Sequence, residues 1–147
     1  MIISKDFKFD CAHMLSNYTG KCANLHGHTY HGTVSIEGEI VNDESRMLLD
    51  YNDIKKIIDM FDHAIIFSSP KAMNEAEHAL LKWASKYDMR VYCMPFDYPK
   101  TTAEDMVHVI ARTIYHQKPE GTEWRVKVTL SETDGSWACA EVTNGTV

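Results

Sequence analysis

The chain has 147 residues, of which 44% are hydrophobic and 24% are charged, and this composition is ordinary for a globular protein. At this length we expect a single domain over residues 1–147 with a buried core. The net charge of −6 argues against broad nucleic-acid binding, which needs a basic surface, but it leaves room for a local basic pocket that binds a phosphorylated small molecule.

Two segments near the N-terminus alternate between apolar and polar residues. The first runs from Ile3 to His13 and predicts a half-buried strand that ends with a histidine on its apolar face. The second runs from His26 to Gly38, and since residues two apart on a strand share a face, His26 and His28 point together. Pairing of the two strands would bring His13 close to that couple.

Two helices and a short strand are predicted in the middle of the chain. Apolar residues at positions 54, 57, 58 and 61 have helical spacing, and this helix should end at about residues 62–63. A second helix begins at Asn74. Its expected apolar stripe consists of Leu80, Trp83, Ala84 and Tyr87. Residues 90–96 (RVYCMPF) then form a short apolar strand that Pro95 interrupts.

A third helix and a hairpin complete the chain. Thr101 or Thr102 is expected to cap the helix, with Glu104 placed for a capping box if Thr101 is the cap. Residues 124–132 alternate, an Asp-Gly pair provides the turn, and residues 137–142 return. Strands and helices come in blocks, which predicts an α+β fold with an antiparallel sheet.

Three histidines on converging apolar faces indicate a metal site. A lone buried histidine is usually a satisfied core residue, but His13, His26 and His28 are predicted to meet. Neutral imidazole is a common zinc ligand, and three protein nitrogens with one open position are typical of catalytic zinc sites. We therefore predict that these three residues bind Zn²⁺.

The thiol of Cys22 lies four residues before His26, and the spacing leaves its role open. As a fourth ligand it would close the site and make the metal structural. In a polar loop beside Lys21 and near a divalent cation, the thiolate would be favoured, which suits a base or a nucleophile. An inert loop thiol is the third interpretation.

The remaining cysteines and the first residues of the chain indicate in which cellular compartment the protein is expected. Cys11, Cys93 and Cys139 lie within apolar strands and are interpreted as structural thiols. Four cysteines in such a chain are typical of cytosolic thiols rather than of a disulfide framework, so we expect a cytoplasmic protein. The first residues lack the apolar segment of a signal peptide, and no run is long enough to span a bilayer, so no membrane partner is expected.

Two further acidic positions have alternative interpretations. Asp62 and His63 follow a predicted helix end, where a solvated terminus is favoured over a carboxylate that orients a histidine for proton transfer.

Glu132 falls on the apolar face of its strand. Either the strand emerges into solvent there, which the pattern favours, or the carboxylate meets a cationic or N–H-rich partner.

Six short motifs occur in a distinctive order. They are F-x-F-D-C-A-H at residues 7–13, C-x-x-x-H-G-H at 22–28, L-L-D-Y at 48–51, D-H at 62–63, T-T-A-E at 101–104 and L-S-E-T at 130–133. Together they resemble the 6-pyruvoyl-tetrahydropterin synthase family over nearly the whole chain. The spacing from the cysteine to H-G-H is most similar to its bacterial branch, the 6-carboxy-5,6,7,8-tetrahydropterin synthases of queuosine and 7-deazapurine biosynthesis.

The resemblance implies a structure and a set of roles. The structure is the tunnelling fold, an antiparallel sheet with helices packed on one face, which oligomerises into trimeric β-barrels and usually hexamers. Zinc is implied on the three histidines, with Cys22 as a base instead of a ligand. Asp62 and His63 would form a proton relay with Cys22, at a site shared between subunits. The implied substrate-binding residues are Glu132, as the anchor of the pterin ring, and Glu104, Thr101 and Thr102.

The implied activity is a zinc-dependent lyase reaction. It converts 7,8-dihydroneopterin triphosphate to 6-carboxy-5,6,7,8-tetrahydropterin and releases acetaldehyde and triphosphate. The alternatives are a 6-pyruvoyl-tetrahydropterin synthase, which retains the three-carbon side chain, and a non-catalytic zinc- or pterin-binding module. A general zinc hydrolase has weaker support because no H-E-x-x-H motif is present.

The chain departs from the family pattern in three places. Cys11 replaces a small residue, and T-T-A-E-D replaces T-x-E-N. Residues 74–99 are interpreted as an added helix and strand.

Overall fold

The computed structural model describes residues 1–41 and 44–145 of the chain. Its elements, in chain order, are β1 (Ile2–His13), the 3-10 turn η1 (Lys21–Ala23), β2 (His26–Gly38), α1 (Tyr51–Ile58), β3 (Ala64–Phe67), α2 (Glu75–Lys86), β4 (Val91–Cys93), α3 (Ala103–Tyr115), β5 (Trp124–Thr133) and β6 (Ser136–Val142). None of the helices in these ranges combines the length and the apolar character needed to cross a bilayer.

The strands form a six-stranded sheet in the order β4-β3-β1-β2-β5-β6. Neighbours from β1 through β2 and β5 to β6 run antiparallel, whereas β3 lies parallel to both β1 and β4. The expected antiparallel sheet is confirmed for β1, β2, β5 and β6, and the sheet also contains β3 and β4 in parallel pairing, which was not expected. Parallel neighbours need a crossover connection, and α2 supplies it between β3 and β4.

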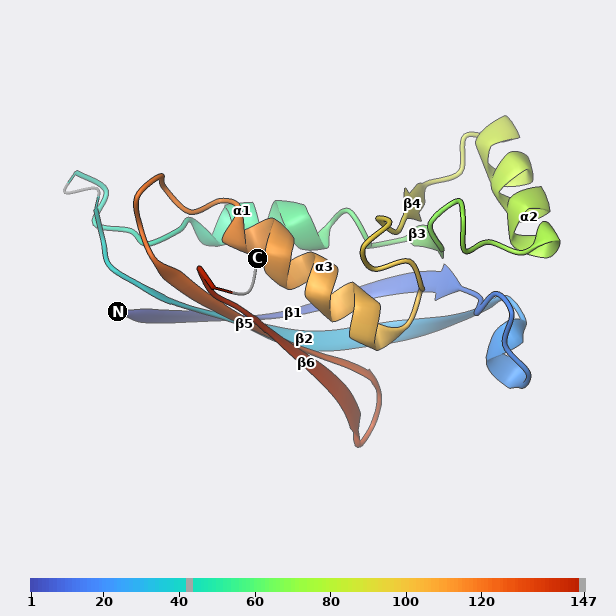
Figure 1. The fold of residues 1–147 in the computed structure, drawn as a ribbon, viewed down its shortest axis with the longest axis horizontal. Coiled ribbons are helices and arrows are strands. Elements are labelled where there is room, and N and C mark those ends of the chain that lie inside the picture. Colours follow the sequence, from blue (N-terminus) through green and yellow to red (C-terminus); the bar gives the residue numbers. More distant parts are fainter. Residues whose placement is uncertain (42–43, 146–147) are drawn as a thin grey trace.

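Two helices cover one face of this sheet, as Figure 1 shows. The helix α3 packs against β5 and β6, and α1 packs against β1. The core between them is apolar and includes Phe9, Tyr30, Ile54 and Ile110, all at most 2% exposed. On the opposite face of the sheet, polar side chains pair across the strands, as in the hydrogen bond of 2.6 Å from Thr33 to Asp6.

The two long N-terminal strands form as the alternation predicts. Burial along β1 alternates and ends with Phe9, Cys11 and His13 buried. Its antiparallel register with β2 sets Cys11 opposite His28 and His13 opposite His26. Because every second residue shares a face, the three histidines lie on the helix-covered side at the same end of the sheet.

The first helix is shorter than its spacing predicts. Ile54, Ile57 and Ile58 are buried as expected, but α1 ends at Ile58, so the predicted end at residues 62–63 is wrong. Phe61 is buried within the turn that follows. This turn reverses the chain into β3, a short strand that was not predicted.

The second helix lies beside β3 and β4, off the end of the sheet (Figure 1). It begins after Asn74, whose side chain accepts a hydrogen bond of 2.9 Å from the Glu77 amide. Its predicted stripe is wrong in part, because Trp83 is 48% exposed and Tyr87 is 56% exposed. The apolar contacts of the helix are limited to a small cluster around Ala84. Its two aromatic side chains lie outside this cluster and stay exposed.

The third helix begins with Thr102 as its cap, which accepts a hydrogen bond of 3.3 Å from the Asp105 amide. Asp105 reaches back to the Lys100 amide at 2.7 Å, while Glu104 is exposed. Of the two predicted caps Thr102 is confirmed, and the capping box that depended on Thr101 as the cap does not form. The hairpin is confirmed, with β5 and β6 joined through residues 134–135.

Candidate metal centre and active site

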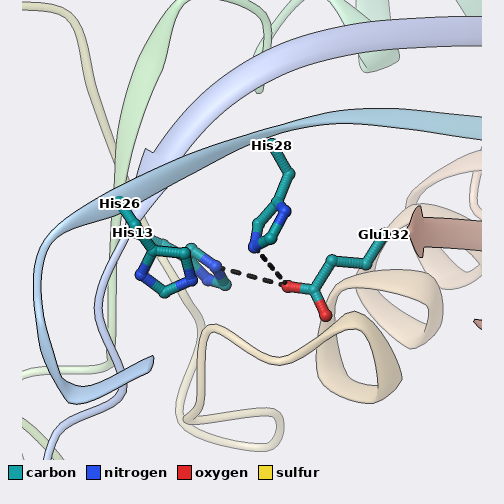
Figure 2. Close-up of side chains that lie close together, drawn as sticks. All are labelled: His13, His26, His28 and Glu132. Atoms are coloured by element: carbon teal, nitrogen blue, oxygen red, sulfur yellow. Dashed lines mark ion pairs between the residues drawn. The ribbon is translucent and has the colours of Figure 1, made fainter. Parts of the chain in front are cut away.

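The strands β1 and β2 bring His13, His26 and His28 together, as predicted. The ring centroid of His13 lies 4.6 Å from that of His26 and 5.4 Å from that of His28, and the other two rings are 4.9 Å apart. Figure 2 shows the three side chains clustered, with Glu132 facing two of them. Their ligand atoms and one carboxylate oxygen of Glu132 all lie within 4.8 Å of one another.

Backbone carbonyls fix the orientation of two of the imidazoles. The Nδ1 atom of His13 lies 2.7 Å from the Thr101 carbonyl, and that of His26 lies 2.7 Å from the Asn24 carbonyl. A carbonyl oxygen only accepts, so each Nδ1 atom carries the proton and each Nε2 atom keeps its lone pair. Such a contact on the far nitrogen is typical of a metal-binding histidine.

The Nε2 atoms of the three histidines are buried and make no hydrogen bond to any residue that the structure describes. Buried polar atoms in folded proteins are nearly always paired, so three unpaired nitrogens in one place need an explanation. Burial also lowers the pKa of His28 and keeps its imidazole neutral, the form that binds metals. The residues present therefore fit a divalent metal ion of the zinc type.

Glu132 is the fourth member of this cluster. A register shift in β5 between Ser131 and Thr133 marks a bulge, and bulges redirect side chains. The Oε1 atom of Glu132 accepts a hydrogen bond of 2.9 Å from the Tyr30 hydroxyl. The favoured expectation of a strand end in solvent is wrong, because this carboxylate faces buried groups.

The carboxylate of Glu132 also approaches two of the histidines. Its Oε1 atom lies 3.2 Å from Nε2 of His28 and 3.4 Å from Nε2 of His13, without hydrogen-bond geometry. The contacts with His13, Tyr30 and His28 lower the pKa of Glu132 to about 2. A carboxylate whose pKa is lowered in this way could act as a fourth ligand of a metal ion or accept hydrogen bonds from the N–H groups of a ligand.

Cys22 lies in η1, close to the cluster but outside it. Its side chain is half-buried, and its carbonyl accepts a hydrogen bond of 2.8 Å from the Leu15 amide. The converging group found among the described residues does not include its sulfur. Burial raises the pKa of Tyr30, Glu132 raises it further, and Cys22 adds a smaller effect, so the thiol lies within electrostatic reach of the site. This placement favours the interpretation of Cys22 as a base or nucleophile over its interpretation as a metal ligand.

Asp62 and His63 form a pair in the turn before β3. One oxygen of Asp62 accepts a hydrogen bond of 3.0 Å from the Asp10 amide, and the other lies 3.0 Å from Nδ1 of His63. The Asp10 amide, and then His63, lower the pKa of Asp62. The pair is solvated, as the favoured interpretation expects, since the His63 side chain is 76% exposed and that of Asp62 is 37% exposed. It lies in a turn after α1 and not at the helix end, and there the carboxylate contacts the imidazole.

Asp62 and His63 are not bonded to Cys22 in the part of the chain that the structure describes. No hydrogen bond or ion pair of the described residues joins it to Asp62 or His63. His63 instead borders a hollow of about 460 Å³. Four residues that line this hollow occupy the positions of β1 and β2 between those of the histidine cluster, so they belong to the other face of the sheet. They are Asp10, Ala12, Gly27 and Thr29.

The segment at the start of α3 supports the cluster. Thr101 is fully buried, its hydroxyl donates to the Met14 carbonyl at 2.8 Å, and its own carbonyl holds His13. Sequence reasoning missed the backbone contacts of Thr101 and Asn24, since any residue type offers a carbonyl. Thr102 caps the helix, and Glu104 lies exposed in its first turn.

Comparison with known proteins places the chain. Residues 2–142 match the family model described as 6-pyruvoyl tetrahydropterin synthase. The 6-carboxy-5,6,7,8-tetrahydropterin synthase of Haemophilus influenzae is 36% identical over 123 residues, which cover 79% of this chain and 83% of that protein. The protein of the same name from Synechocystis is 30% identical over 90 residues, which cover 56% of this chain and 70% of that protein.

Solved structures show the same fold. The 6-pyruvoyl tetrahydropterin synthase of Plasmodium falciparum has a TM-score of 0.63 at 16% identity, covering 97% of this chain and 98% of that chain. That of Caenorhabditis elegans has a TM-score of 0.57 at 21% identity, covering 97% and 95%. The tunnelling fold is thereby confirmed. Because the family model spans nearly all of the sequence, the chain belongs to the 6-pyruvoyl tetrahydropterin synthase family.

Proposed function

We propose that this protein is a zinc-dependent lyase that converts 7,8-dihydroneopterin triphosphate and one water molecule to 6-carboxy-5,6,7,8-tetrahydropterin, acetaldehyde and triphosphate. The observation that carries this proposal is the set of three buried Nε2 atoms that converge without a hydrogen bond to any described residue, in a chain of this family. The names of the curated relatives favour the carboxy-forming branch and, with it, a place in queuosine and 7-deazapurine biosynthesis.

The three histidines His13, His26 and His28 would hold the zinc ion. The Thr101 and Asn24 carbonyls keep the first two imidazoles in the tautomer that presents Nε2. Zinc, when bound, supplies a Lewis acid that polarises an oxygen of the substrate side chain.

Proton transfer is assigned to the side chains around this centre. Cys22, as the thiolate, takes a proton from the substrate side chain, and it stands outside the metal-binding group. Asp62 holds the Nδ1 side of His63, so that Nε2 of His63 exchanges the proton with substrate.

The site is proposed to form between subunits of a homo-oligomer, a trimer or a hexamer. His63 borders a hollow that includes the outer face of the sheet, whereas the metal cluster lies on the helix-covered face. A relay that serves Cys22 is therefore best supplied by a neighbouring copy. The sheet has β4 and β6 as its outermost strands, and unpaired strand edges are suited to joining copies in a barrel.

Substrate binding is assigned mainly to Glu132, which would accept hydrogen bonds from the ring N–H and amino groups of the pterin. Glu104 and Thr102 at the start of α3 are proposed as secondary pocket residues, and Thr101 contributes through His13. The cytoplasmic location expected from the thiols is part of the proposal.

Product analysis tests the proposed reaction. Zinc-loaded protein is incubated with 7,8-dihydroneopterin triphosphate, the pterin is identified by mass spectrometry, and acetaldehyde is assayed separately. We expect 6-carboxy-5,6,7,8-tetrahydropterin and an equal amount of acetaldehyde. A pterin that keeps all three side-chain carbons would assign the protein to the 6-pyruvoyl-forming activity, which the family model's name favours. Unchanged substrate in the presence of bound zinc would indicate a binding module.

A further inference from the structure

One buried carboxylate has no part in the site described so far. Glu77 lies on α2 and is 0% exposed. Burying a charge is costly unless it is hydrogen-bonded. Its Oε1 atom accepts a hydrogen bond of 2.5 Å from the Ser68 amide, and its Oε2 atom accepts one from the Ser16 hydroxyl. Both partners belong to segments that flank β1 and β3.

Ser16 lies in the loop that leads from β1 to η1, the turn that carries Cys22. Its Oγ atom also accepts a hydrogen bond of 3.0 Å from the Asn74 amide, and its carbonyl accepts one of 3.4 Å from Lys100. The next residue towards the strand, Leu15, donates its amide to the Cys22 carbonyl at 2.8 Å. In Figure 1, α2 and this loop lie at the same end of the sheet.

We propose that Glu77 is a positioning residue for the Cys22 thiol and acts through Ser16. The contacts form a short chain from the helix to the turn: Glu77 fixes Ser16, the adjacent Leu15 holds the Cys22 carbonyl, and η1 then presents the side chain. The segment that carries α2 thereby sets the geometry of the loop that carries Cys22. The inference rests on the proposed role of Cys22 as the base.

A purely structural role for Glu77 makes a different prediction. The N-terminus of α2 is already capped by Asn74, whose side chain accepts from the Glu77 amide. If the carboxylate only stabilised the helix, its loss would lower the free energy of unfolding and leave the reactivity of Cys22 in the folded protein unchanged. If it positions the loop, the thiol itself must respond.

The test uses Glu77→Gln, Ser16→Ala and the double variant, with Glu75→Gln as the matched control. Glu75 lies exposed on the same helix and carries the same charge. Glutamine has one acceptor oxygen in place of two, so it cannot accept from the Ser68 amide and the Ser16 hydroxyl together. The readout is the alkylation rate of Cys22 by iodoacetamide, resolved by peptide mass spectrometry, with the exposed Cys139 as internal reference.

We expect each single variant to alkylate at Cys22 about tenfold faster than the parent protein, the equivalent of about 1.4 kcal/mol. The half-buried thiol becomes more accessible when its loop is released. The double variant should match the larger of the two single effects, because both substitutions break the same hydrogen bond between Ser16 and Glu77. Zinc content should stay unchanged, and kcat should fall by about ten- to a hundredfold with KM nearly constant. The control should behave as the parent.

Alkylation of Cys22 at the parent rate in folded Glu77→Gln and Ser16→Ala would overturn the inference, and so would additive effects in the double variant. If Glu77→Gln does not fold, Ser16→Ala decides alone, since it removes a single hydroxyl. A parent protein that fails to turn over the pterin would refute the proposed function, whereas the alkylation comparison would still decide whether Glu77 positions the loop.

Discussion

Replacing Glu132 with glutamine separates the two roles that its position allows. The carboxylate accepts from the Tyr30 hydroxyl at 2.9 Å and lies within 3.4 Å of the Nε2 atoms of His13 and His28. Glutamine keeps the size and one acceptor oxygen, so the contact with Tyr30 survives. It loses the negative charge, and an N–H₂ group replaces the second oxygen.

The expected magnitude follows from the hydrogen bonds that the pterin would make. A hydrogen bond to a charged group contributes about 1.5–3 kcal/mol, and the substitution removes one such bond and weakens its neighbour. A loss of about 2–3 kcal/mol corresponds to a fall in kcat/KM of about 30- to 160-fold. Zinc content should stay at the parent level because the three histidines remain.

The assay measures zinc by elemental mass spectrometry and kcat/KM by steady-state turnover of the pterin triphosphate, on the same preparation. Glu123→Gln, an exposed change of the same chemistry before β5, is the matched control. Joint loss of zinc and activity would refute the anchor role and make Glu132 a fourth metal ligand. An unchanged kcat/KM would refute both roles.

Three further predictions concern the thiol, the metal and the sheet. Cys22→Ala should lower kcat by about 10²–10⁴-fold and leave zinc content unchanged, as turnover and elemental analysis would show; a loss of metal would contradict the assignment. Zinc at a free concentration of about 100 times its Kd should raise the free energy of unfolding by about 2.7 kcal/mol, and an unchanged value in denaturant titrations would argue against a site in the folded chain. Gly32→Ala should destabilise the protein by about 1–3 kcal/mol, because its Cβ atom would lie 2.3 Å from the Phe7 ring and 2.4 Å from the Thr129 carbonyl. Equal stability in chemical denaturation would show that the strands can shift apart there.

The convergence of His13, His26 and His28 was predictable because its geometry is local. Alternation in β1 and β2 determines which histidines share a face, and antiparallel pairing sets His13 opposite His26. The hairpin of β5 and β6 was predictable for the same reason, since the Asp-Gly turn specifies it. Each of these features depends on residues that are near in sequence or opposite in one ladder.

Other features depend on tertiary contacts that no local pattern encodes. The strand β3 is a run of four apolar residues, which periodicity cannot distinguish from the continuation of a helix, and its parallel pairing with β1 is non-local. Trp83 and Tyr87 have helical spacing but no layer to cover them. The hydrogen bond from His13 reaches a backbone carbonyl of Thr101, 88 residues away in sequence.

The resemblance to a family assigned the roles that spacing left open. Spacing alone did not decide between ligand and catalyst for Cys22, and the described structure places its sulfur outside the converging group. For Asp62 and His63 the pattern favoured a solvated helix end. The pair is solvated, but it lies in a turn after α1 stops at Ile58.

The coordination of zinc by the parent protein tests the central claim most directly. X-ray absorption at the zinc edge, on protein loaded with about one equivalent of metal, reports the atoms bound to the ion. Three imidazole nitrogens should appear at about 2.0–2.1 Å, with any further light ligand at a similar distance and no sulfur shell. A scatterer at about 2.3 Å, the zinc–sulfur distance, would show that Cys22 binds the metal and would contradict the account.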